Sequence, residues 1–172
     1  KKLHLPINET PALLKWNSFL DKFKNPKHTV IIALVGKYVE LHDAYKSITE
    51  AFIHAGSVNE IKVVVKWVHS EKLKPKNIAK QLENIDGLLV APGFGERGIE
   101  GKIEAIKYVR ENNIPFLGVC LGMQMAVIEF ARNVIGFTDA NSTEMLTDTK
   151  HPVIDLMESQ KSITQKGGTM RL

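Results

Sequence analysis

The only cysteine of the chain, Cys120, stands where a short apolar run changes into a helical pattern. Residues 116–119 predict a buried strand, and apolar residues then recur at helical spacing. Gly118 and Gly122 flank the cysteine two positions away on each side. Small neighbours let a strained strand-to-helix turn expose its side chain, and the first N–H groups of a helix favour a thiolate. The pattern therefore predicts a nucleophile at Cys120. The apolar stripe of the helix is expected to comprise Met123, Ala126, Val127 and Phe130.

Residues 118–124 resemble the nucleophile elbow of the class I (triad) glutamine amidotransferases. Residues 129–133, 139–144 and 167–172 extend this resemblance to the amidotransferase domain of the CTP synthase family, over nearly the whole chain. The resemblance implies that Cys120 hydrolyses L-glutamine through a thioester. The ammonia released would serve the ATP-dependent amination of UTP to CTP in pyrimidine biosynthesis.

Three alternatives remain open for this part of the chain. Cys120 could be a small buried hydrophobe, since free cysteine is among the most buried residue types, although a buried filler needs no glycine on both sides. The chain could be another class I amidotransferase or a hydrolase that shares the elbow. It could also be a non-catalytic, GTP-responsive interaction module.

A glycine-rich loop at residues 92–98 follows a predicted strand at residues 86–91. Open α/β sheets bind their ligands at such loops, although a flexible turn with positive φ at each glycine is the simpler interpretation. The resemblance implies that the N–H groups of Gly93 and Leu121 bind the oxyanion of the reaction. Pro92 replaces a family glycine and has no N–H, so the loop donor is placed on Gly93. The glycines of the loop are Gly93, Gly95 and Gly98.

The resemblance also implies a glutamine pocket, in which Glu144 contacts the α-amino group and Gln124 helps to orient the substrate. An exposed surface charge is the alternative for Glu144. The residues expected to contact glutamine are Gly93, Leu121, Gly122, Met123, Gln124 and Glu144.

A regulatory surface is implied near Lys37, Tyr38 and Arg97, with GTP as an allosteric activator. An ordinary turn is the alternative, because the single glycine before Lys37 is far short of a phosphate-binding loop.

The reaction needs a histidine to protonate the leaving ammonia and a carboxylate to orient that histidine. His151 is a weak candidate, because Val153 stands where related amidotransferases carry a glutamate. The resemblance places the family's His-x-Glu downstream of residues 167–172. We therefore expect an incomplete active site and an isolated chain that is nearly inactive.

Alternating strands and helices predict an α/β fold, with a doubly wound, mostly parallel, flavodoxin-like sheet and flanking helices. The strand at residues 30–35 should be central and the strand at 61–68 nearer an edge. Gly56 should cap the helix at residues 43–55. Further helices are predicted at residues 75–82 and 99–112.

Residues 1–28 are predicted to form a lead-in with a short helix from a synthase domain, with Trp16 packed on the sheet. Residues 29–172 should form the amidotransferase domain, and both ends are expected to be cuts in a longer chain. The synthase domain would bind ATP and Mg and would form a homotetramer.

Composition narrows the class of protein. The 172 residues, with 44% hydrophobic and 24% charged, suit one α/β domain. A net charge of +4 on dispersed lysines gives no support for nucleic-acid or membrane binding. One cysteine excludes a disulfide framework and a Cys-rich zinc site, and no metal or cofactor site is predicted in this domain. With no apolar run near 18 residues, a cytoplasmic location is expected.

Overall fold

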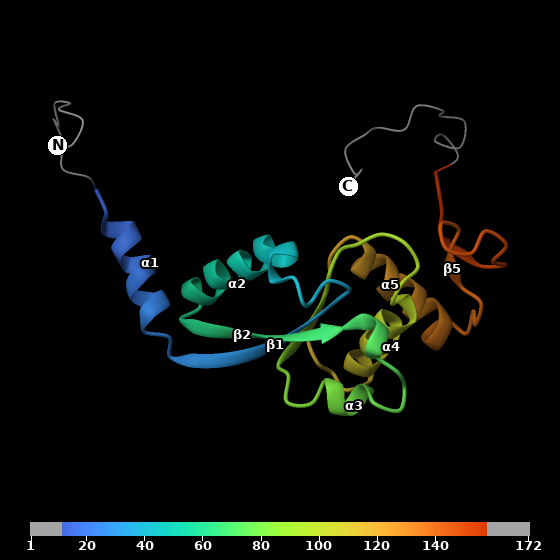
Figure 1. Cartoon of the computed structure of the whole chain (residues 1–172), viewed down its shortest axis with the longest axis horizontal. Coiled ribbons are helices and arrows are strands. Elements are labelled where there is room, and N and C mark those ends of the chain that lie inside the picture. The colour runs from blue at the N-terminus through green and yellow to red at the C-terminus, as the bar shows by residue number, and fades with distance from the viewer. Residues whose placement is uncertain (1–11, 158–172) are drawn as a thin grey trace.

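The computed structural model describes residues 12–157, in which four parallel strands form the central sheet (Figure 1). Their order is β2-β1-β3-β4, so β1 is internal and β2 is at an edge, as predicted. The strands are β1 (His28–Gly36), β2 (Ile61–His69), β3 (Gly87–Val90) and β4 (Phe116–Gly118). A second, two-stranded sheet pairs β5 (Asn141–Ser142) with β6 (Pro152–Ile154).

The helices connect the strands and cover both faces of the sheet (Figure 1). They are α1 (Leu14–Lys24), α2 (Lys46–Val58), α3 (Ile78–Gln81), α4 (Ile99–Glu111) and α5 (Leu121–Phe130), with short helical turns at His42–Tyr45, Ser70–Lys72 and Ala131–Ile135. The chain adds β2 on one side of β1, then β3 and β4 on the other. This reversal confirms the doubly wound fold and creates a switch point between β1 and β3, where such sheets bind ligands.

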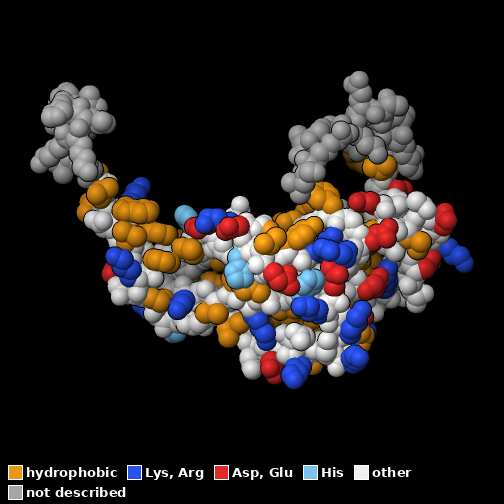
Figure 2. Space-filling view, in the orientation of Figure 1, with side chains coloured by type: hydrophobic (Ala, Val, Ile, Leu, Met, Phe, Trp, Pro, Cys, Tyr) orange, Lys and Arg blue, Asp and Glu red, His pale blue; other side chains and the backbone are white. Residues whose placement is uncertain are grey.

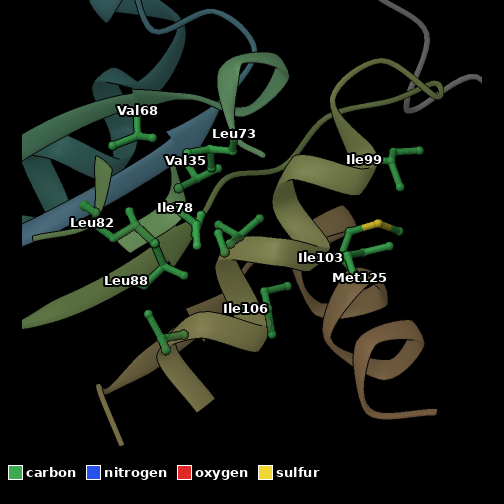
Figure 3. Close-up of a cluster of buried hydrophobic side chains, with 14 of the residues drawn as sticks. Val35, Val68, Leu73, Ile78, Leu82, Leu88, Ile99, Ile103, Ile106 and Met125 are labelled. Carbon is green, nitrogen blue, oxygen red and sulfur yellow. The ribbon is translucent and has the colours of Figure 1, made fainter. Parts of the chain in front are cut away.

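Alternate residues of β1 and β3 enter two separate cores, which explains why these strands are apolar throughout. In β1, Ala33 and Val35 pack toward α3, α4 and α5, whereas Leu34 packs toward α2. In β3, Leu88 and Leu89 divide in the same way. Figure 3 shows the first core, to which α4 and α5 contribute Ile99, Ile103, Ile106 and Met125.

The predicted end of α2 is wrong. Gly56 does not cap the helix, which continues to Val58. A Cβ at Gly56 would lie 2.6 Å from the carbonyl oxygen of Ile61. Glycine is therefore required by close packing of α2 on the start of β2, a tertiary contact that a capping rule does not contain.

The predicted burial of β4 is also wrong for the part of the chain that the structure describes. Phe116 is 37% exposed and Leu117 is 58% exposed. The reason is topological, because β4 is an edge strand of the described sheet. A short apolar run predicts a strand but not its place in the sheet.

The predicted apolar stripe of α5 is not the side of the helix that enters the core. Met123, Val127 and Phe130 are exposed, whereas Leu121, Met125 and Ile128 enter the core. Both sides of α5 are apolar, so helical spacing alone cannot select the buried one.

Helix α1 lies at one end of the molecule and packs on α2 (Figure 1). Ser57 Oγ donates a 3.0 Å hydrogen bond to the carbonyl oxygen of Phe19, whose ring contacts His54. Trp16 stacks on Phe19 with ring centroids 5.6 Å apart and is 56% exposed. The prediction that Trp16 packs on the sheet is therefore wrong.

Residues 1–11 of the predicted lead-in and the motif at residues 167–172 lie outside the described residues. From residue 12 to residue 157, no helix has the length and apolar character needed to cross a bilayer.

Candidate active site

Cys120 occupies the turn between β4 and α5 with φ 53° and ψ −109°. This left-handed backbone is unfavourable for a residue with a Cβ and costs about 1–3 kcal/mol, which is typical of functional turns. The residue is exposed, so it is not a small buried hydrophobe.

The two glycines around Cys120 are required by sterics. A Cβ at Gly118 would lie 2.6 Å from the backbone nitrogen of Met123. A Cβ at Gly122 would lie 2.2 Å from the carbonyl oxygen of Val90 in β3. The lack of a side chain at Gly118 allows the tight turn. The lack of one at Gly122 lets the start of α5 lie against the sheet, as the spacing of the motif predicts.

The loop after β3 lies beside this turn, because β3 and β4 are paired neighbours. The N–H of Val119 donates to the carbonyl oxygen of Val90 at 3.1 Å. A Cβ built on Gly93 would lie 3.8 Å from Leu121 Cδ2. Within residues 12–157, the N–H groups of Gly93 and Leu121 donate to no acceptor. Two free backbone donors therefore belong to adjacent segments at this end of the sheet.

The expected positive φ is present at Gly95 (72°) and Gly98 (76°) but not at Gly93. Every neighbour of a Cβ built on Gly93 would be at least 3.6 Å away, which is an ordinary contact. Neither backbone conformation nor crowding by neighbours requires glycine at this position.

Lys37 follows β1 and holds the loop from one side. Its Nζ donates to the carbonyl oxygens of Phe94 and Gly95, the latter at 3.5 Å. Burial lowers the pKa of Lys37, the charge of Arg97 lowers it further, and the charge of Glu71 opposes the shift.

Lys102 of α4 holds the start of the same loop and is completely buried. Its Nζ lies 3.3 Å from the carbonyl oxygen of Ala91. Burial, with a contribution from Lys37, lowers the pKa of Lys102 to about 8, while the Cys120 thiolate acts in the opposite direction. Our sequence analysis gave Lys102 no role. The available signal was its place in the apolar stripe formed with Ile99 and Ile106.

The other two predicted regulatory residues, Tyr38 and Arg97, contact each other. The Arg97 guanidinium is 5.8 Å from the centre of the Tyr38 ring, and its Nε lies 3.0 Å from Glu71 Oε1. Arg97, Glu71 and Ser70 line an open hollow of about 320 Å³. The buried Oγ of Ser70 has no hydrogen-bond partner in the described part of the chain.

The predicted glutamine-contacting residues fall into two groups. Gly122, Met123 and Gln124 belong to the first turn of α5, next to Cys120. Glu144 follows β5 of the small sheet, which packs against α5. The Glu144 carboxylate is exposed and makes no hydrogen bond or ion pair within residues 12–157. No direct hydrogen bond therefore joins Glu144 to the cysteine turn.

The structure also contains a histidine–carboxylate pair. His151 Nδ1 lies 2.5 Å from Asp139 Oδ1, and the ring stacks on Phe137 at 4.2 Å. The hydrogen bond to His151 lowers the pKa of Asp139. Sequence analysis did not find this partner, because the two residues are 12 positions apart across a loop. No histidine between residues 12 and 157 is hydrogen-bonded to Cys120. In the same range, no cluster of three or more His, Cys, Asp or Glu side chains could hold a metal ion.

Comparison with known proteins identifies the class to which this site belongs. The family model "Glutamine amidotransferase class-I" matches residues 40–172. The chain belongs to the class I glutamine amidotransferases.

Within that class, the whole chain is similar to CTP synthases. It is 69% identical over 172 residues to CTP synthase from Flavobacterium psychrophilum and 58% identical over 178 residues to CTP synthase from Methanocaldococcus jannaschii. All of this chain aligns, but it spans only about a third of those relatives, 32% and 33% respectively.

A solved structure gives the same result. The glutaminase domain of Trypanosoma brucei CTPS with bound acivicin matches with a TM-score of 0.72 and 42% identity, over 77% of this chain and 52% of that chain. The comparisons confirm both the resemblance to CTP synthases and the predicted fold.

Proposed function

We propose that this chain is the glutamine-hydrolysing part of a CTP synthase. The observation that carries the proposal is the exposed Cys120 at a strained turn, near N–H groups of Gly93 and Leu121 that have no acceptor among residues 12–157. In the whole protein, the ammonia would be used to aminate UTP to CTP at the expense of ATP.

The proposed reaction begins with attack of the Cys120 thiolate on the γ-carbonyl carbon of glutamine. The oxyanion accepts hydrogen bonds from the Gly93 and Leu121 N–H groups. When the intermediate collapses to the thioester, the C–N bond breaks, and the nitrogen takes a proton from the protonated general base and leaves as ammonia. Water then hydrolyses the thioester to release glutamate and regenerate the thiol. Loss of one such donor typically costs about 10²–10³-fold in kcat.

We propose that Gln124 orients the substrate and that Glu144 binds its α-ammonium group, since an exposed carboxylate with no partner among the described residues suits a cation. His151 and Asp139 form a histidine–carboxylate pair, but in the described part of the chain His151 makes no hydrogen bond to Cys120. We therefore propose that the general base and its carboxylate come from outside the described residues, as the family resemblance implies.

We further propose that Lys37, Tyr38 and Arg97 form a GTP-responsive surface. Two observations support this proposal. Arg97 lies over the Tyr38 ring, and the adjacent hollow includes Ser70, whose hydroxyl has no hydrogen-bond partner among the described residues. Arginine and buried hydroxyl groups suit phosphate oxygens.

Residues 1–28 are proposed to lead from a synthase domain into the amidotransferase domain at residues 29–172. Figure 2 shows hydrophobic side chains gathered on α1, where Leu14 and Trp16 are exposed. Such a surface suits contact with another domain. In this proposal, ATP and Mg belong to the synthase domain, the whole protein is a cytoplasmic homotetramer, and this part needs no metal or cofactor.

Labelling of Cys120 tests the proposed function. Acivicin, which is bound in the Trypanosoma brucei domain, should modify Cys120 of the intact protein stoichiometrically, as followed by mass spectrometry of the peptide that contains it. L-Glutamine should block the reaction, whereas asparagine, one methylene shorter, should protect much less. Labelling no faster than that of free cysteine, and unaffected by glutamine, would instead support a non-catalytic module.

A further inference from the structure

Lys102 is the largest fully buried side chain of the described chain. An ammonium group loses much of its hydration in such a place, and a methionine of similar length would fill the space without that cost. A buried, unusually titrating group beside the loop at residues 92–98 is therefore a candidate for a role in the site.

The contacts of Lys102 point to the oxyanion loop. Its Nζ donates to the carbonyl oxygen of Ala91, two residues before Gly93, and lies 3.8 Å from a Cβ built on Gly93. The Leu121 side chain lies 3.8 Å from the same point. Lys37 binds the carbonyl oxygens of Phe94 and Gly95. Two ammonium groups thus hold the backbone on both sides of Gly93.

The surroundings of Lys102 leave it a backbone acceptor. Of the acidic groups on other elements packed against α4, Glu71 is paired with Arg97, and Glu129 is paired with Arg110. In the described part of the chain, the Lys102 ammonium therefore has the Ala91 carbonyl oxygen as its hydrogen-bond acceptor.

We propose that Lys102 is a positioning residue of the glutamine-hydrolysing site: its buried ammonium fixes the backbone that carries Gly93, whose N–H is the proposed oxyanion donor. The inference rests on that proposed role of the Gly93 N–H. It assigns Lys102 no contact with glutamine.

The test measures kcat and KM for glutamine hydrolysis by the intact protein at pH 7. The variants are Lys102→Met, which removes the charge and the donor, and Lys102→Gln, which removes the charge but keeps a donor for the Ala91 carbonyl. Lys107→Met, on the same helix, is the matched control.

Lys102→Met should lower kcat about fivefold, because the Gly93 N–H is then held less firmly in place. Glutamine hydrolysis should lose kcat rather than KM, and Lys102→Gln should retain more activity than Lys102→Met. Lys107→Met should match the unaltered protein throughout.

A kcat of both variants equal to that of the unaltered protein would overturn the inference. Thermal denaturation shows that each variant is folded, and either neutral variant alone gives a decisive kcat. Failure of acivicin to label Cys120 of the unaltered protein would instead defeat the proposed function.

Discussion

Lys102 has an ordinary lysine pKa in the unfolded chain, near 10.4, and a pKa of about 8 in the fold. The folded state therefore binds this proton more weakly than the unfolded state does. The free-energy cost of burying the charged Lys102 side chain is fully present below pH 8, and it is relieved as the pH rises toward 10.5.

Lys102→Met should therefore raise the free energy of unfolding by about 2 kcal/mol at pH 7 and change it little at pH 10.5. Urea denaturation at both pH values measures the difference, with Lys107→Met as the control. A variant that is less stable than the unaltered protein by the same amount at both pH values would contradict the assigned burial cost.

At the residue scale, the sequence was most informative where steric limits alone determine which residue type a position can hold. The glycines around Cys120 could be predicted, because each avoids a backbone clash at a fixed spacing. The role of Lys102 could not be predicted, since burial of an ammonium depends on which side of α4 meets the sheet. The Asp139–His151 pair depends in the same way on how a loop closes.

At the element scale, the turn from β4 into α5 depends on Gly118. An alanine there would place its Cβ 2.6 Å from backbone atoms that cannot move independently of the helix. Gly118→Ala should therefore lower the free energy of unfolding by about 2–4 kcal/mol.

Gly93→Ala is the matched control for Gly118→Ala, because its nearest new contact is 3.6 Å and its N–H is kept. Urea denaturation should show near-native stability for this control. Equal stability of the two variants would mean that the turn tolerates a side chain and that the glycine spacing is not structural.

Helices α4 and α5 are joined by an ion pair between Arg110 and the buried Glu129. Arg110 Nη2 lies 2.8 Å from Glu129 Oε1, and its Nε is within 3.1 Å of both carboxylate oxygens. The hydrogen bond to Glu129 raises the pKa of Arg110.

Glu129→Ala leaves a cavity and an arginine without its main partner, so it should cost about 2–4 kcal/mol of unfolding free energy. Glu111 makes only a long, exposed contact of 3.7 Å with the same arginine. Glu111→Ala should change stability by less than about 0.5 kcal/mol in the same urea titration. Similar losses in both variants would contradict the structural weight given to the buried pair.

Most strands and helices could be predicted from periodicity, because their apolar patterns reflect local geometry. The buried side of α5, the exposure of β4 and the extension of α2 through Gly56 could not. Each depends on a neighbour that is distant in sequence, and α5 is apolar on both sides.

At the scale of the whole molecule, the strand order explains why distant segments meet. The loops after β1, β3 and β4 end at one edge of the sheet and bring Lys37, Gly93 and Cys120 together around the β1/β3 switch point. The alternation of strands and helices predicts this arrangement. The partners of the whole protein could not be predicted in this way, because the chain spans only about a third of the length of its CTP synthase relatives.

The most direct test of the central claim compares two ammonia sources in the intact protein carrying Cys120→Ala. Glutamine-dependent CTP formation should fall by about 10³-fold or more, because no thioester can form. CTP formation with added ammonia should stay close to that of the unaltered protein. Loss of both activities would show that Cys120 is structural, and retention of both would show that another group hydrolyses glutamine.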